Sequence, residues 1–432
     1  MSDSPTSRRG FLKTLTAGAV TAPLLARAER LDAALTSSIK GVTFRANAPT
    51  SIRALRDRYL LSSDLIYLNH ASIGTTPTPV LEAHAGYLEL CETHPSLYVW
   101  GSVWREATED ARARAARLVN CSADDLAITH NTTEGFSLLA HGLPLVGGDE
   151  VLFSSINHAG AAVAWDGLAD AQGFTVRRFD FPVGSASELT ADEVVQLHVD
   201  AVRPETRVLV IPHVDNMVGL NHPIREIGAA VRRAGVEWVL VDGAQSVGMI
   251  PVDLTDAGVD AYAMSCHKWL QSPKGLGLLY VSPALRGSLP RMWFKTPEAR
   301  MDGTARDYED YSTRAWPGVV ALGDALAFQG ALGEVEKGRR YRALWNHVQG
   351  RVDAEPGLIW RSPRPWDLGS MIMAVEVRGR SAPELGPVLL ETTGGVVRPF
   401  GGDLNALRIS PNLMTEESEL DRFLDALVAA AA

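Results

Sequence analysis

Two short apolar runs, each followed by polar side chains, constrain the fold of this chain more than any other feature. The first run, residues 238–241, leads into Asp242, and the second ends in Ser265, just before Lys268. Runs of this kind predict strands, and open α/β sheets form their ligand sites at the carboxyl ends of strands. A lysine among His, Ser and Trp neighbours is suited to lose its proton and react as an amine. We therefore predict an α/β fold with a reactive lysine at its ligand site.

Taken alone, Asp242 would be read as a turn cap and Lys268 as an exposed loop residue. Their combination, D-G-A-Q starting at Asp242 and S-C-H-K ending at Lys268, resembles the cofactor signature of the class V aminotransferase family of pyridoxal 5'-phosphate (PLP) enzymes. The resemblance implies that Lys268 binds PLP covalently and that Asp242 pairs with the pyridinium nitrogen, keeping it protonated and the ring an electron sink. It also implies that Gln245 bonds the ring hydroxyl, while Ser265 and His267 reach the phosphate.

The resemblance extends over roughly residues 60 to 430 and implies the PLP-dependent transferase fold type I, as a homodimer. The expected division is a large domain at residues 65–315 and a small C-terminal α+β domain at 316–432. Alternating strand and helix patterns from about 125 to 280 independently predict a mostly parallel sheet with helices on both faces.

A helix N-terminus is predicted to hold the cofactor phosphate. Asn131, Thr132 and Thr133 open a helix, where free N–H groups and the helix dipole favour an anion. A bare N-cap is the alternative, but the segment resembles the family's phosphate loop with Asn in place of its first Gly. By the same resemblance, Thr313 reaches the phosphate of the neighbouring subunit, although the flanking Gly and Asp of that motif are missing.

Four further residues are expected near the ring or the substrate. His158 matches the family's ring-stacking histidine, although a lone histidine there would usually be a turn residue. Asn216 follows P-H-V-D, and the resemblance places it near the ring hydroxyl and the substrate. Asn69 and His70 open a turn at the family's entry to the active site, where ordinary turn chemistry is an equal alternative.

Two arginines of the C-terminal domain are expected to bind a substrate carboxylate. Arg408 lies in R-I-S, which resembles the family's carboxylate-binding motif, and Arg398 matches an upstream arginine near the substrate. The planar guanidinium fits a carboxylate at two points. Surface ion pairs are the alternative.

The resemblance implies a reaction at the Cα of an amino acid, isopenicillin N epimerase-like in our first interpretation. An aminotransferase and a carbon–sulfur β-lyase are the alternatives, followed by a non-catalytic PLP-fold binding protein. Cysteine desulfurases carry a persulfide-forming cysteine after the upstream arginine, but residues 399–404 contain no thiol.

The N-terminus predicts export. Residues 7–13, S-R-R-G-F-L-K, match the twin-arginine pattern, and Ala26-Arg27-Ala28 provides a small-x-small cleavage site. We therefore expect a signal peptide at 1–28, an arm at 29–64, recognition by the twin-arginine export machinery, and a periplasmic or exported protein. A disordered basic N-terminus is the alternative.

Composition excludes several other classes. The formal net charge of −10 argues against a nucleic-acid partner, and no uninterrupted apolar run of membrane-spanning length occurs. Three cysteines without C-x-x-C spacing predict neither a metal site nor a disulfide framework, although a Cys91–Cys121 bridge is conceivable in an oxidising compartment. The expected partner is a small amino-acid substrate.

Overall fold

The computed structural model describes residues 52–93, 95, 102–290, 303–309 and 312–431. The predicted signal peptide and most of the predicted arm lie outside the described residues, so these two predictions are not addressed by the structure.

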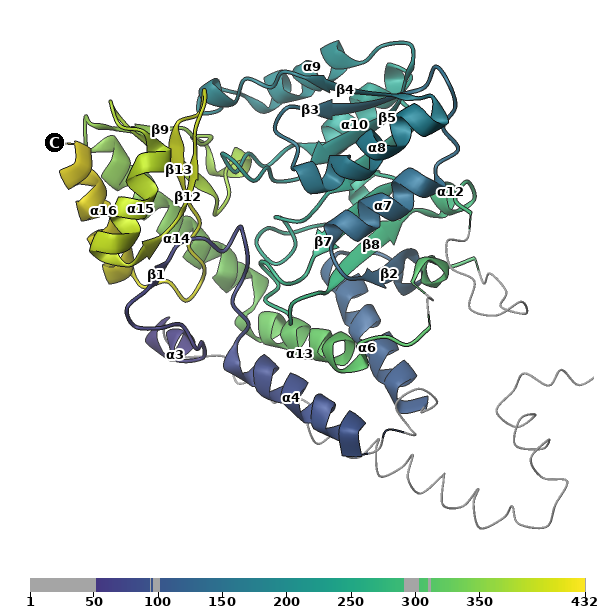
Figure 1. Ribbon diagram of the computed structural model, residues 1–432, viewed down its shortest axis with the longest axis horizontal. Coiled ribbons are helices and arrows are strands. Elements are labelled where there is room, and N and C mark those ends of the chain that lie inside the picture. The colour runs from purple at the N-terminus through teal and green to yellow at the C-terminus, as the bar shows by residue number, and fades with distance from the viewer. Residues whose placement is uncertain (1–51, 94, 96–101, 291–302, 310–311, 432) are drawn as a thin grey trace, which may run out of the picture.

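A seven-stranded sheet forms the centre of the larger lobe of the described chain (Figure 1). Its order is β2-β8-β7-β6-β5-β3-β4, and β8 runs antiparallel to both neighbours while the other pairs are parallel. The mostly parallel sheet predicted from the sequence is thereby confirmed. The strands are β2 (Leu126–Thr129), β3 (Glu150–Ser154), β4 (Thr175–Phe179), β5 (Thr206–Pro212), β6 (Trp238–Asp242), β7 (Ala261–Ser265) and β8 (Gly277–Val281).

Helices cover both faces of this sheet, which explains why an inner strand such as β6 is continuously apolar rather than alternating. Along β6, Val239 and Val241 join a buried cluster with side chains of α6, α9, α10 and α13. Leu240, which points to the opposite face, packs with side chains of α7 and α8. The covering helices are α6 (Ser102–Leu118), α7 (Thr132–Gly142), α8 (Ala159–Gln172), α9 (Ala191–Ala201), α10 (Ile224–Arg233) and α13 (Trp316–Leu332).

A smaller antiparallel sheet, in the order β12-β13-β10-β9, forms the second lobe with three helices packed around it (Figure 1). Leu344, Leu385 and Phe423 each bring one of these helices into a common buried cluster. The elements are α14 (Glu334–Asp353), β9 (Leu358–Trp360), β10 (Met373–Val377), α15 (Ala382–Thr393), β12 (Arg398–Phe400), β13 (Ala406–Ile409) and α16 (Glu417–Ala431).

The beginning of the described chain lies against its end. β1 (Ile66–Tyr67) pairs in parallel with β11 (Gly395–Val396), so the purple N-terminal segment lies beside the yellow C-terminal lobe in Figure 1. Conversely, α13 packs against α4 (Thr78–Thr93) and α6 of the larger lobe. Chain contacts thus cross the expected domain boundaries at 65 and 316, and those boundaries stay a prediction.

The remaining elements of the described chain are short and lie between the longer helices and strands. Among the described residues no single helix has both the length and the apolar content to span a membrane; α13 and α14 meet the criteria only together, and they are bent by 75°. The short elements are α3 (Ile52–Arg56), α11 (Leu254–Ala257), α12 (Pro283–Arg286), η1 (Ala123–Asp125), η2 (Val183–Ser185), η3 (Ala305–Tyr308) and η4 (Trp366–Leu368).

The β2 edge of the large sheet is closed by charged side chains instead of another strand. Glu309 forms ion pairs with Arg112 at 2.6 Å and with Arg314 at 3.0 Å, and it also accepts a hydrogen bond from the backbone N–H of Ile128. Arg314 donates to the Ile128 carbonyl at 2.8 Å, and Arg112 donates to that of Leu126 at 2.8 Å. We name Arg112, Glu309 and Arg314 the edge cluster. Because these charges pair the edge backbone groups, β2 needs no further neighbour.

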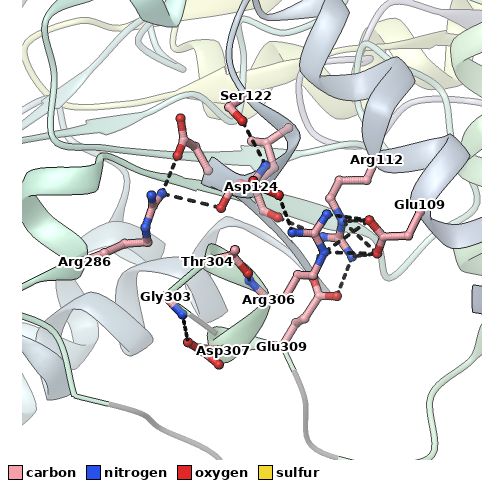
Figure 2. Close-up of polar contacts among 12 residues, drawn as sticks. Glu109, Arg112, Ser122, Asp124, Arg286, Gly303, Thr304, Arg306, Asp307 and Glu309 are labelled. Atoms are coloured by element: carbon pink, nitrogen blue, oxygen red, sulfur yellow. Dashed lines mark hydrogen bonds and ion pairs between the residues drawn. The ribbon is translucent and has the colours of Figure 1, made fainter. Parts of the chain in front are cut away.

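Around the edge cluster lies a wider set of ion pairs, which Figure 2 shows. Glu109 contacts both Arg112 and Arg306, and Arg306 also pairs with Asp124 at 2.8 Å. These ion pairs connect η3 to α6 and to η1.

Candidate active site

The structure places Lys268 in the turn between β7 and β8, one strand away from Asp242 at the end of β6. Burial lowers the pKa of Lys268 to about 8, with Asp242 acting in the opposite direction and Arg408 in the same direction as burial. About a tenth of this amine is therefore unprotonated at pH 7, far more than in an ordinary lysine, and a nucleophilic lysine reacts in that form.

Asp242 is a buried carboxylate with few partners. One of its oxygens accepts the Ala244 backbone N–H at 2.9 Å. Burial raises its pKa, whereas that N–H and the charges of Lys268 and His158 lower it. A cation placed against this carboxylate would offset its desolvation.

The predicted phosphate end is assembled from α7 and β7. Asn131 caps α7 by accepting the Glu134 N–H at 2.9 Å, and the Thr132 and Ser265 hydroxyls are 2.8 Å apart. The helix can approach the sheet this closely because a Cβ on Gly277 would lie only 2.7 Å from the Asn131 Cα. The predicted residues of this end, Thr132 and Ser265, are therefore brought together.

Two more predicted residues lie at this end. Thr133 is exposed in the first turn of α7, near Gly160 in the first turn of α8. Burial lowers the pKa of His267 to about 4, and its Nδ1 atom is buried without a hydrogen-bond partner in the described part of the chain. An anion at the start of α7 would find unused donors there.

His158 lies at the N-terminus of α8, and its Nδ1 accepts the Gly160 N–H at 3.0 Å. In the neutral ring the proton is consequently on Nε2. Burial lowers the pKa of His158, Asp242 raises it, and Lys268 and Arg408 lower it, so the imidazole is close enough to these charges to sense them.

The Gln245 side chain has partners that the sequence did not reveal. Its amide nitrogen donates to the Ala71 carbonyl at 2.7 Å, and its oxygen accepts the Trp269 indole N–H at 2.9 Å. The amide thus ties the N-terminal turn to the lysine loop. Its second N–H is the group left for the expected bond to the ring hydroxyl, which stays a prediction.

Arg408 is buried to 3% exposure and contacts only neutral acceptors. It donates to the Asn216 carbonyl at 2.8 Å, to Asn69 Oδ1 at 2.7 Å and to Ser72 Oγ at 2.5 Å. Its Nε is buried without a partner, and it forms no ion pair with any carboxylate of the described residues. Burial lowers its pKa to about 10. The charge of Asp215 acts in the opposite direction, although within the described residues it forms no ion pair with the guanidinium. A ligand carboxylate in direct contact with Arg408 would compensate its charge more fully.

The structure explains two residues that the sequence analysis missed. Asp215 is fully buried and accepts the backbone N–H groups of Met217, Val218 and Leu220 at 2.6–2.8 Å, which shapes the loop that offers the Asn216 carbonyl to Arg408. The tendency of Asp to bond N–H groups shortly after it was the available signal. Ser72 had no such signal beyond its place in the Asn69 turn.

Other predicted positions differ from expectation or stay open. His70 has no exposed surface, and its ring centre lies 4.8 Å from that of Tyr67, which favours the turn role over contact with a substrate. Thr313 is exposed, and no contact among the described residues joins it to the other site residues. Arg398 is exposed on β12, beside Arg408.

The residues present fit PLP. The carboxyl end of one sheet brings together groups that match each part of this cofactor. The desolvated amine suits the aldehyde, and the buried carboxylate suits the basic ring nitrogen. The unpartnered imidazole nitrogen and the helix N-terminus suit the phosphate. The fold and the site define a PLP-dependent enzyme of fold type I.

Comparison with known proteins identifies the family. The model of the aminotransferase class-V family matches residues 66–417, and the chain belongs to this family. It is 30% identical to isopenicillin N epimerase of Streptomyces clavuligerus over 398 residues, covering 87% of this chain and 97% of the relative. It is 28% identical to a cysteine desulfurase of Escherichia coli O8 (strain IAI1) over 325 residues, covering 69% and 75%.

Solved structures have the same fold. A C-DES mutant with glycine covalently linked to its PLP cofactor superimposes with a TM-score of 0.78 at 23% identity, covering 86% of this chain and 98% of that one. The apo cysteine desulfurase of Thermococcus onnurineus NA1 gives a TM-score of 0.76 at 20% identity, covering 89% and 99%.

Proposed function

We propose that this PLP-dependent enzyme epimerises an amino acid at Cα, in the manner of isopenicillin N epimerase. The observation that carries the proposal is the pairing of a reactive amine with a buried guanidinium. Lys268 is largely desolvated and Arg408 has only neutral partners, which suits a substrate with an amino group and a carboxylate on one carbon.

In this proposal each residue has one task. PLP bound through Lys268 supplies the electron sink that weakens the bonds at Cα. Asp242 keeps the ring nitrogen protonated, and His158 packs on the ring. Thr132, Thr133, Ser265 and His267 hold the phosphate.

The substrate is oriented by Arg408. Its guanidinium fixes the carboxylate, with the Ser72 hydroxyl giving up its place to a carboxylate oxygen. Because Asn69 and the Asn216 carbonyl hold the guanidinium from two other sides, its plane is set before substrate arrives. A fixed carboxylate sets the torsion at Cα, so that the bond to the α-proton is aligned for cleavage.

The absence of a reactive thiol favours epimerisation over desulfuration. Burial raises the pKa of all three cysteines, Cys91, Cys121 and Cys266, to about 12. All three are free in the structure, and residues 399–404 contain no cysteine. A persulfide-forming nucleophile needs an accessible thiolate, which none of these provides.

A carbon–sulfur β-lyase is the second candidate, because β-elimination needs the same α-proton removal and no enzyme thiol. The 28% identity to cysteine desulfurases over 69% of the chain supports acting on a sulfur amino acid. Transamination is the third possibility and shares the first proton transfer.

One assay separates these reactions. Purified holoenzyme is incubated with L- and D-amino acids in deuterium oxide, and α-proton exchange, stereochemistry, keto acid, ammonia and sulfide are measured. We expect exchange with inversion and no keto acid. Pyruvate with ammonia or a thiol would establish the lyase, keto acid alone the aminotransferase, and no exchange with any amino acid would contradict all three.

We also propose that the protein is exported by the twin-arginine machinery and works as a homodimer to which Thr313 contributes. The motif at residues 7–13 supports export. Replacing Arg8 and Arg9 by lysine should retain the protein in the cytoplasm with its PLP bound. A periplasmic double variant, or a cytoplasmic wild-type protein in its host, would contradict this. Sedimentation of the holoenzyme as a monomer would contradict the dimer.

A further inference from the structure

Two guanidinium groups lie on the same face of the small sheet without an acidic partner. β12 and β13 are antiparallel, and Arg398 is directly opposite Arg408 in their register. Residues directly opposite in an antiparallel pair project to the same face, so the two side chains are neighbours. On the other side of Arg408 the opposite residue is Ala374, which is small and buried.

An aromatic ring organises this pair. The guanidinium carbon of Arg398 is 5.9 Å from the centre of the Phe400 ring, and that of Arg408 is 5.8 Å away. Both distances are within cation–π range, and the ring holds two like charges beside one another. Arg398 lowers the pKa of Arg408, which is the electrostatic cost of this arrangement.

Arg398 is exposed, whereas Arg408 is buried and differs from the other buried arginines of the described residues. Arg112 and Arg314 share Glu309, and Arg340 pairs with Glu417 at 2.9 Å. Within the described residues neither Arg398 nor Arg408 forms an ion pair, and the Arg398 side chain makes no hydrogen bond; Asp215 acts on Arg408 by its charge without direct contact. Like charges opposite one another destabilise a sheet, so a pair that forms no internal ion pair is suited to an anion supplied from outside.

We propose that Arg398 recognises a second acidic group of the substrate, so that the enzyme acts on amino acids that carry a distal carboxylate. This inference rests on the proposed function, in which Arg408 takes the α-carboxylate. Arg408 has few unused N–H groups beyond those needed for one carboxylate, whereas all the N–H groups of the Arg398 guanidinium are available. The Phe400 ring between the two charges offers an apolar surface for the methylene chain that joins the two carboxylates.

Binding of unreactive probes tests the proposal without depending on turnover. Titration calorimetry on the holoenzyme compares the dicarboxylates glutarate and adipate with the monocarboxylates butyrate and hexanoate. We expect the dicarboxylates to bind at least about tenfold more tightly, the strength of one added charge-assisted hydrogen-bonded pair. In Arg398→Met this preference should disappear, and Arg398→Lys should retain part of it.

The control is Arg378→Met, which removes the same charge from an exposed arginine just beyond β10 of the same sheet. It should keep the full dicarboxylate preference. A preference that is absent in the wild-type protein, or that Arg378→Met removes as well, would overturn the proposal. So would an equal loss of monocarboxylates and dicarboxylates in Arg398→Met, which would mean that both arginines hold one carboxylate.

A second measurement separates this inference from the proposed function. Exchange of the α-proton in deuterium oxide is compared for glutamate and glutamine, which differ only in the distal group. Faster exchange of glutamate, lost in Arg398→Met, supports both proposals. If neither amino acid exchanges but glutarate still binds through Arg398, the proposed function fails and the distal-anion site stands.

Discussion

The active site and the edge cluster both contain buried charges, but only the edge cluster pairs its arginines with a carboxylate of the protein. In the edge cluster Glu309 is shared by Arg112 and Arg314, and the remaining donors reach backbone carbonyls. In the active site Arg408 has neutral acceptors only, and Lys268 is desolvated enough that its pKa falls to about 8.

The difference indicates what each region is for. Buried charges that are paired inside the protein hold a segment in place, and removing one partner leaves the other uncompensated. Buried charges that are left unpaired cost stability, and proteins keep them where a ligand completes the pairing. Substitutions in the two regions should therefore separate activity from stability.

The largest expected effect is that of Lys268→Ala. Turnover should fall by several orders of magnitude because the covalent attachment of PLP and the amine that moves protons are both lost. The apoprotein should be no less stable, since a desolvated amine has been removed. Thermal unfolding, turnover and borohydride labelling followed by peptide mapping measure this. A reduced PLP label on a different lysine of the wild-type protein would refute the assignment.

The second-largest effect is expected for Asp242→Asn. Loss of the anion lets the ring nitrogen deprotonate, and we expect a rate loss on the order of 10³-fold. The free energy of unfolding of the apoprotein should not decrease, because a buried charge has been neutralised. Asp256→Asn, which removes a carboxylate from the exposed pair with Arg225, is the matched control and should leave the rate unchanged. Near-normal turnover in Asp242→Asn would remove Asp242 from the mechanism.

Glu309→Gln should show the opposite pattern. It leaves Arg112 and Arg314 buried without their carboxylate, and we expect the free energy of unfolding to fall by about 3–5 kcal/mol. Glu336→Gln, in the exposed pair with Arg339, should change it by less than about 1 kcal/mol. Denaturant unfolding of both variants makes the comparison. Equal effects would show that the edge cluster contributes no more than a surface pair.

The smallest effect concerns pH. Burial lowers the pKa of Lys268 to about 8, below the ordinary lysine value, so the reactive unprotonated amine increases as pH rises through 8 and is nearly complete only above about pH 9. The rate at which apoprotein takes up PLP should rise between about pH 6 and 9 and then level off. Absorbance of the bound cofactor follows it, with a short lysine peptide as control. A rate that keeps rising to pH 10, as in the peptide, would show an unperturbed amine.

Local features of the fold followed directly from the sequence. The apolar runs became β6 and β7, and the polar residues after them lie at their carboxyl ends. Asn131 is the N-cap of α7, as its side chain and position indicated. These features depend on residues close together in the chain, where propensity and capping are sufficient.

What the sequence did not reveal depends on contacts between distant residues. Gln245 contacts Ala71, 174 positions away, and Glu309 contacts Ile128, 181 positions away. No local pattern marks such pairs, because either residue alone is compatible with an exposed position. The two alternatives for His70 stayed open for the same reason, since its packing against Tyr67 and Trp269 has no local signal.

The contact between Asn69 and Arg408 also has a consequence for the synthesis of the protein. The two residues are separated by 339 positions, so at ~5–20 residues per second about 20–70 s pass between their translation. During the later part of that interval, once residue 268 has been added, the nascent chain contains Asp242 and Lys268 but not the guanidinium that orients the substrate. A ribosome-bound chain halted before β13 should therefore acquire PLP without discriminating among amines, and selectivity should appear only when the last strand is added.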